Sequence, residues 1–83
     1  MKIRLKTVCP EQLGRLPDGE YEVADGSTAQ QALCACMEAA GLRPASAETL
    51  SQLVWLRNSS PIRPGAPLSE GDRLIVLRPL TGG

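Results

Sequence analysis

The amino-acid chain ends in Thr81-Gly82-Gly83, and the group there that can do chemistry is the terminal carboxylate. Gly82 and Gly83 carry no Cβ, so this end can enter a channel too narrow for other residues. The carboxylate has an ordinary pKa of about 3.5, so at neutral pH it is ionised and needs activation before it reacts as an electrophile. We therefore expect residues 79–83 to form a flexible tail that delivers Gly83 to another protein. Fully extended, this tail spans about 17–18 Å.

The other candidates for chemistry are three cysteines, Cys9, Cys34 and Cys36. Cys34 and Cys36 fall in a predicted helix, where side chains two positions apart diverge around the axis. The chain has no His to complete a zinc site, and an iron–sulfur cluster usually requires four cysteines. We expect free thiols that act as small apolar residues, with no bound metal or cofactor. A phosphate-binding Gly-rich loop and a nucleophile–base pair are also missing, so we expect no enzyme activity from this chain alone.

Composition indicates a small globular protein. The 83 residues are 42% hydrophobic, which fits one domain over residues 1–83. Nine basic residues balance nine acidic ones, which argues against nucleic-acid or membrane-surface binding. No apolar stretch is long enough to span a membrane, and charges alternate with apolar residues at the N-terminus, unlike a signal peptide. We expect a cytoplasmic protein.

Hydrophobic periodicity and turn residues place the structural elements along the chain. Strands are predicted at residues 2–8, 20–24, 53–57 and 73–78, a helix at 28–40 and a short helical turn within 45–52. Thr28 or Ser27 can cap the start of the helix, with Gln31 or Gln30 three residues on to complete a capping box, and Gly41 is the stop signal. Residues 61–67 carry three prolines and cannot form a central strand.

The order of these elements predicts an α+β fold. One main helix packs on one face of a mixed sheet of four to five strands. The first and last strands are both strongly apolar, and pairing them in parallel at the sheet centre gives the β-grasp arrangement. The helix between them supplies the long connection that a parallel pair requires.

The segment from Leu68 to Gly83, LSEGDRLIVLRPLTGG, resembles the end of the prokaryotic ubiquitin-like sulfur carriers. These include the small subunit of molybdopterin synthase and the sulfur carrier of thiamin biosynthesis. Both tend to show an Asn after the third strand, a Leu-x-x-Gly-Asp turn, a hydrophobic strand and a terminal Gly-Gly. The matching residues are Asn58, Leu68, Gly71, Asp72, Gly82 and Gly83. The chain length and the ending RPLTGG resemble the molybdopterin branch more, whereas the proline-rich loop and the lack of Phe depart from the family.

The resemblance implies a function for the tail. An adenylating enzyme of the ubiquitin-activating type would activate Gly83 with ATP, and a sulfur donor would convert it to a thiocarboxylate. The charged carrier would then dock on the large subunit of a sulfur-accepting synthase. A pterin acceptor gives molybdopterin, and a thiazole precursor gives the thiamin ring. Alternatives are a different sulfur-containing metabolite, a ubiquitin-like modifier joined to lysines, or, in another class, a passive β-grasp interaction module.

A docking surface is expected beside the tail. In the last strand, likeness to ubiquitin-type domains places Leu74 and Val76 against the helix and Ile75 and Leu77 outward. Exposed apolar side chains there would bind a partner, together with Pro79, Leu80 and Thr81 of the tail. Trp55 stays open: it joins this patch if its neighbours in the strand face the helix, and otherwise it lies in the core.

Overall fold

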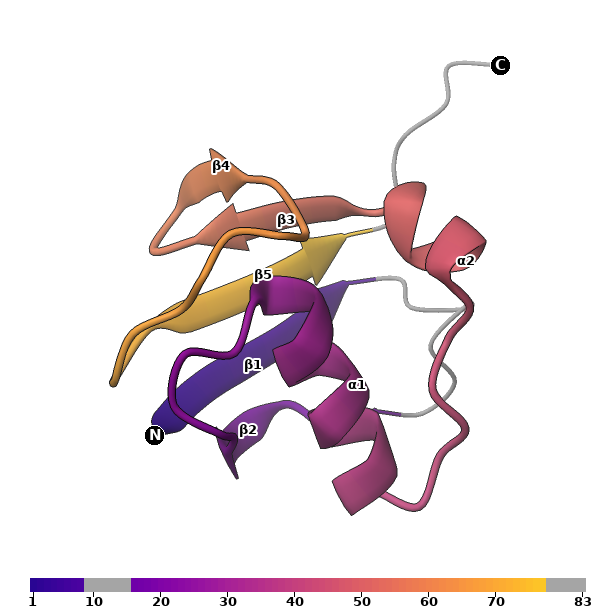
Figure 1. The fold of residues 1–83 in the computed structure, drawn as a ribbon, viewed down its shortest axis with the longest axis horizontal. Helices are drawn as coiled ribbons and strands as arrows, with labels where there is room; N and C mark the ends of the chain where they lie inside the picture. The colour runs from indigo at the N-terminus through magenta and orange to yellow at the C-terminus, as the bar shows by residue number, and fades with distance from the viewer. Residues whose placement is uncertain (9–15, 78–83) are drawn as a thin grey trace.

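The computed structural model describes residues 1–8 and 16–77. Their elements, in chain order, are β1 (Lys2–Val8), β2 (Gly19–Glu22), α1 (Ala29–Ala39), α2 (Ala47–Ser51), β3 (Val54–Arg57), β4 (Ser60–Ile62) and β5 (Arg73–Leu77). Figure 1 shows α1 crossing one face of a twisted sheet, with α2 beside the end of that sheet. Each predicted strand and helix is present, with bounds that differ by at most two residues over the described residues, and β4 is a strand that the sequence did not predict. None of the helices described is long and apolar enough to cross a membrane.

The sheet has five strands in the order β2-β1-β5-β3-β4. β1 and β5 are parallel, and the other neighbouring pairs are antiparallel. The last strand therefore lies at the centre beside the first, which confirms the predicted β-grasp arrangement. The proline-containing β4 lies at the edge, where a missing backbone N–H breaks no ladder between strands.

The core lies between the sheet and α1. Alternate side chains of the two central strands face the helix, and Leu5 and Leu74 are neighbours in the parallel register. Across from them, α1 contributes an apolar face that includes Leu33 and Met37. Because burial of such side chains is the main favourable term in folding, this layer holds the helix against the sheet.

Local sequence fixes both ends of α1. Thr28 Oγ1 accepts a hydrogen bond from the Gln31 backbone N–H, and Gln31 Oε1 accepts one from the Thr28 backbone N–H. This is the predicted capping box. Gly41 follows the helix with a φ of +77°, and the Leu42 N–H donates to Met37 O at 2.8 Å. Glycine adopts this left-handed backbone conformation without steric cost, and a residue in this conformation terminates the helix.

The proline-rich connection between β4 and β5 completes the start of α1. The backbone N–H groups of Ala29 and Gln30 donate to Ala66 O and Pro64 O, each at 2.8 Å. The first N–H groups of a helix have no partner within it, so this segment supplies acceptors that α1 needs. The proline-rich loop that departs from the family pattern thus supplies backbone acceptors to the first turn of α1.

A polar cluster around Asn58 and Asp72 joins the β3–β4 turn to the start of β5. The Asn58 side-chain amide donates to Asp72 Oδ1 at 3.1 Å, and Asn58 Oδ1 accepts from the Arg73 N–H at 3.0 Å. Asp72 Oδ2 accepts from the Ser69 N–H at 2.7 Å. Asn58 and Ser59 both have positive φ, as a two-residue hairpin turn of the primed type requires. The Asn and Asp of the family motif therefore position β5.

We expect Asn58→Ala to lower the free energy of unfolding by about 2 kcal/mol, through left-handed backbone strain and lost hydrogen bonds. Asn58→Gly loses the same hydrogen bonds but tolerates the positive φ, so its loss should be about 1 kcal/mol. Urea unfolding of the two variants and the unaltered protein measures both effects. Equal losses in the two variants would contradict the strained-turn explanation.

Candidate functional site

The open face of the sheet, opposite α1, is the candidate site. The strands alternate strictly, so Leu74 and Val76 of β5 are buried beneath α1, whereas Ile75 and Leu77 are half-buried on the open face. This matches the orientation predicted for the four residues. That Ile75 and Leu77 bind a partner stays a prediction.

Neighbouring strands extend these two residues into a larger apolar surface. Leu77 lies between Val8 of β1 and Val54 of β3, and Ile75 lies beside Leu56 of β3. Val8 and Val54 are each 39% exposed and are the exposed large apolar residues of the described chain. We call Val8, Val54, Leu56, Ile75 and Leu77 the outer patch. Exposed apolar side chains gathered in this way are typical of a protein-binding surface.

The outer patch lies where the chain leaves the sheet. Leu77 is both a member of the patch and the last residue of β5. Pro79, Leu80, Thr81, Gly82 and Gly83 lie outside the described residues. Their predicted roles in threading and activation therefore stay predictions, but the surface from which the tail starts is defined.

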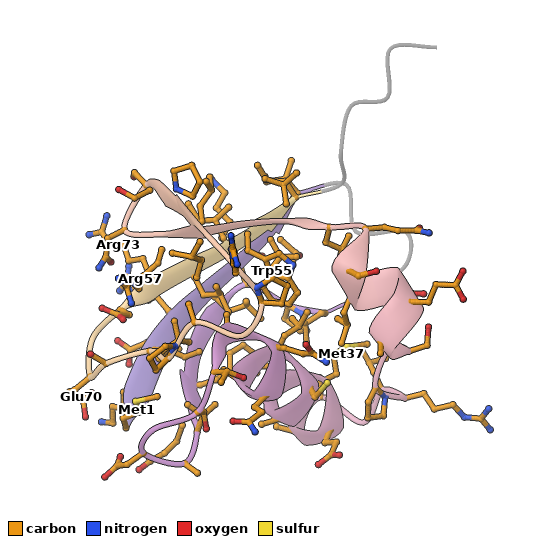
Figure 2. All side chains as sticks on the ribbon, turned by 45° about the horizontal axis from the view of Figure 1, so that its top comes forward. Met1, Met37, Trp55, Arg57, Glu70 and Arg73 are labelled. Atoms are coloured by element: carbon orange, nitrogen blue, oxygen red, sulfur yellow. The ribbon has the colours of Figure 1, made fainter. Side chains whose placement is uncertain are left out.

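Of the two positions left open for Trp55, the structure shows the core, so Trp55 is not part of the partner-binding surface. Trp55 faces α1 and is 2% exposed, and its indole N–H donates to Leu50 O at 3.1 Å. Figure 2 shows Trp55 in the layer between sheet and helix. Because buried indole groups need a hydrogen-bond acceptor, α2 serves this role by placing Leu50 O beside the ring. Trp55 is a core residue, and its neighbours Val54 and Leu56 occupy the open face instead.

Sequence reasoning missed Val8, Val54 and Leu56 as members of the outer patch. A signal was present for Val8, because it shares its side of β1 with the exposed Lys2, Arg4 and Lys6 by simple alternation. An apolar residue that follows three charged ones on the same side of a strand indicates that the surface changes there from charged to apolar. For β3 no such signal existed. Val54, Trp55 and Leu56 are all apolar, so either face of this strand could be the buried one.

The cysteines within the described residues lie on α1. Cys36 is buried, and burial raises the pKa of its thiol to about 11. Cys34 is half-buried, and desolvation raises the pKa of its thiol too. A raised pKa leaves little of the reactive thiolate at neutral pH. Over residues 1–8 and 16–77, no three His, Cys, Asp or Glu side chains gather as a metal site would require.

The fold has known counterparts among solved structures. The crystal structure of SAMP1 from Haloferax volcanii superposes with a TM-score of 0.70 at 21% identity and covers 100% of both chains. A second structure, of H. volcanii small archaeal modifier protein 1, gives the same score and identity and covers 95% of this chain and 98% of the other. A ubiquitin-like protein from Caldiarchaeum subterraneum gives a TM-score of 0.52 at 16% identity, covering 99% and 100%.

These similarities establish a ubiquitin-like β-grasp fold. No protein-family model and no curated protein sequence matches the chain.

We expect Cys36 to resist alkylation in the folded protein. At pH 8, a pKa of about 11 leaves the Cys36 thiolate fraction roughly 100-fold below that of a thiol titrating at 9.0. Brief treatment with iodoacetamide followed by peptide mass spectrometry should show Cys36 unmodified, and treatment in urea should label it fully. Rapid native labelling of Cys36 would contradict its burial. Because the folded pKa is raised, stability from this group should decline as pH rises from 9 towards 11.

Proposed function

We propose that this protein is a carrier whose Gly83 carboxylate is activated by a partner enzyme and converted to a thiocarboxylate for sulfur transfer. The observation that carries the proposal is the course of β5. This strand runs through the sheet centre, ends at Leu77 inside the outer patch and continues in sequence into Gly82-Gly83. A docking surface and a deliverable end group are thus joined by a few residues.

The chemistry requires two steps on a partner. An oxygen of the Gly83 carboxylate attacks the α-phosphorus of ATP, which forms an acyl adenylate and releases pyrophosphate. Hydrosulfide released by a sulfur donor then attacks the acyl carbon, the new C–S bond forms and AMP leaves with the former carboxylate oxygen, so that the chain ends in a thiocarboxylate. Sulfur in this anionic form is a strong nucleophile, as cysteine thiolates are. ATP is used by the activating enzyme, and we propose that the carrier itself binds no cofactor.

The acceptor we favour is a pterin, with this chain as the small subunit of molybdopterin synthase. Its support is the resemblance of the sequence from residue 68 onward, especially the ending RPLTGG. The thiazole of thiamin is the alternative acceptor. Asn58 and Asp72 do not discriminate between them, because both residues serve the β-grasp architecture.

A ubiquitin-like modifier is a second candidate. The observation in its favour is that small archaeal modifier protein 1 of H. volcanii is one of the structural neighbours. Conjugation to a lysine would begin with the same adenylation of Gly83, so both candidates need the same free end and the same activating partner. A passive interaction module would instead tolerate deletion of Gly83.

We expect mild purification from the native cells to yield a species heavier by one sulfur-for-oxygen exchange, localised to Gly83 by fragmentation mass spectrometry. Incubation with ATP, a sulfide source and the cell's activating enzyme should increase it. Gly82→Val should block this reaction because a branched side chain obstructs a narrow channel, while the melting curve stays unchanged. Activation of Gly82→Val at the normal rate would argue against threading.

Val54→Asp should weaken binding to the activating enzyme at least about 10-fold, because a charge is then placed in an apolar contact. Val54 is exposed, so folding should be retained. Ala24→Asp is the matched control, since it adds the same charge at an exposed position after β2. Titration calorimetry and thermal melting of both variants separate docking from stability. Equal affinities of the two variants would remove the outer patch from the docking surface.

A further inference from the structure

The open face changes character along β5. At its carboxyl end lies the apolar outer patch, and at its amino end Arg73 lies beside Arg4 of β1 in the parallel register. Between these ends, Lys6 is the neighbour of Ile75. The three cations surround an open hollow of about 590 Å³ that Ile75 also lines. The hollow is therefore continuous with the outer patch.

Two carboxylates share the hollow, and both have a partner already. Glu20 lies across from Arg4 in the β1–β2 register, with 4.0 Å between Glu20 Oε1 and an Arg4 guanidinium nitrogen. Asp18 Oδ1 accepts a hydrogen bond from the Thr7 N–H at 3.0 Å. Lys6 and Arg73 form no ion pair with any residue of the described ranges. The lining thus holds one cation more than it holds anions.

The placement of Arg73 has no structural benefit that we can identify. Like charges directly opposite each other on neighbouring strands are unfavourable, and Arg73 stands opposite Arg4. Figure 2 shows the Arg73 side chain extending away from the core at the end of the sheet. A carboxylate placed between these groups would relieve the repulsion, and the planar guanidinium fork fits a carboxylate in a bidentate manner.

We propose that the protein partner that docks on the outer patch inserts an Asp or Glu side chain into this hollow, with Arg73 as its main anchor. The inference rests on the proposed docking function and specifies the chemistry of the partner. Arg73 and Ile75 are two residues apart on one face of a strand, so the partner's carboxylate must lie about 7 Å from the apolar group that contacts Ile75. A nucleic acid fits poorly, because its successive phosphates would meet the carboxylates of Asp18 and Glu20, which line the hollow.

The test uses the purified activating enzyme from the same cells and the full-length chain. At low salt, Arg73→Glu should slow association about 10-fold, and the difference should fall to within about twofold near 0.5 M salt, where exposed charges are screened. Arg73→Gln should reduce the association rate by an intermediate factor. It should not lower the melting temperature, because it removes the repulsion between Arg73 and Arg4.

Arg43→Glu is the control, since Arg43 is exposed in the connection between α1 and α2. It should change association less than about twofold. An Arg73→Glu variant that associates as fast as the unaltered protein at low salt would overturn the inference, as would an equal loss in Arg43→Glu.

The two proposals fail in different ways. With enzyme in saturating amount, Arg73→Glu should still acquire the thiocarboxylate, because Gly83 is intact. If the unaltered protein binds and is activated but Arg73→Glu behaves identically, the acidic-partner inference alone fails. If the unaltered protein neither binds the enzyme nor is activated, both proposals are overturned.

Discussion

The parallel pairing of β1 and β5 is the constraint on which the rest of the structure depends. It places the last described strand at the centre of the sheet, where both neighbours hold it. A parallel pair needs a long connection between its strands, and α1, α2 and the β3–β4 hairpin are accommodated within that connection. Since β5 cannot shift without disrupting the core and the Asn58–Asp72 cluster, the point at which the chain leaves the sheet is fixed.

Strand alternation then assigns the chemistry of the two faces. A shift of one residue in β5 would move Leu74 and Val76 out of the core and place Ile75 and Leu77 in it, so the outer patch and the core are specified by the same register. The cation-lined hollow follows from that register too, because Arg4, Lys6 and Arg73 all project to the open side. The face opposite α1 is thus divided along its length into an apolar part and a charged part.

Sequence reasoning was most successful where a local rule applies. The capping box of Thr28 and Gln31, the stop at Gly41 and the exclusion of a central strand at residues 61–67 each rest on backbone chemistry that neighbours in sequence decide. The family motif around Asn58, Leu68, Gly71 and Asp72 correctly indicated the fold. The structure shows why: Asn58 and Asp72 join the β3–β4 turn to the start of β5, so these residues are required by the architecture whichever partner is bound.

The sequence by itself determined the α+β class, the element order apart from β4, and the two alternating pairs of β5, while likeness to ubiquitin-type domains indicated which pair faces inward. The tertiary structure decided which side chains from distant parts of the chain are neighbours. The buried position of Trp55 depends on Leu50 O of α2, the outer patch depends on Val8 and Val54 meeting across Leu77, and the hollow depends on Arg4 standing beside Arg73. The physical reason is that these contacts join segments far apart in the chain. Periodicity reports the face on which a side chain lies, whereas strand order and register determine its neighbours.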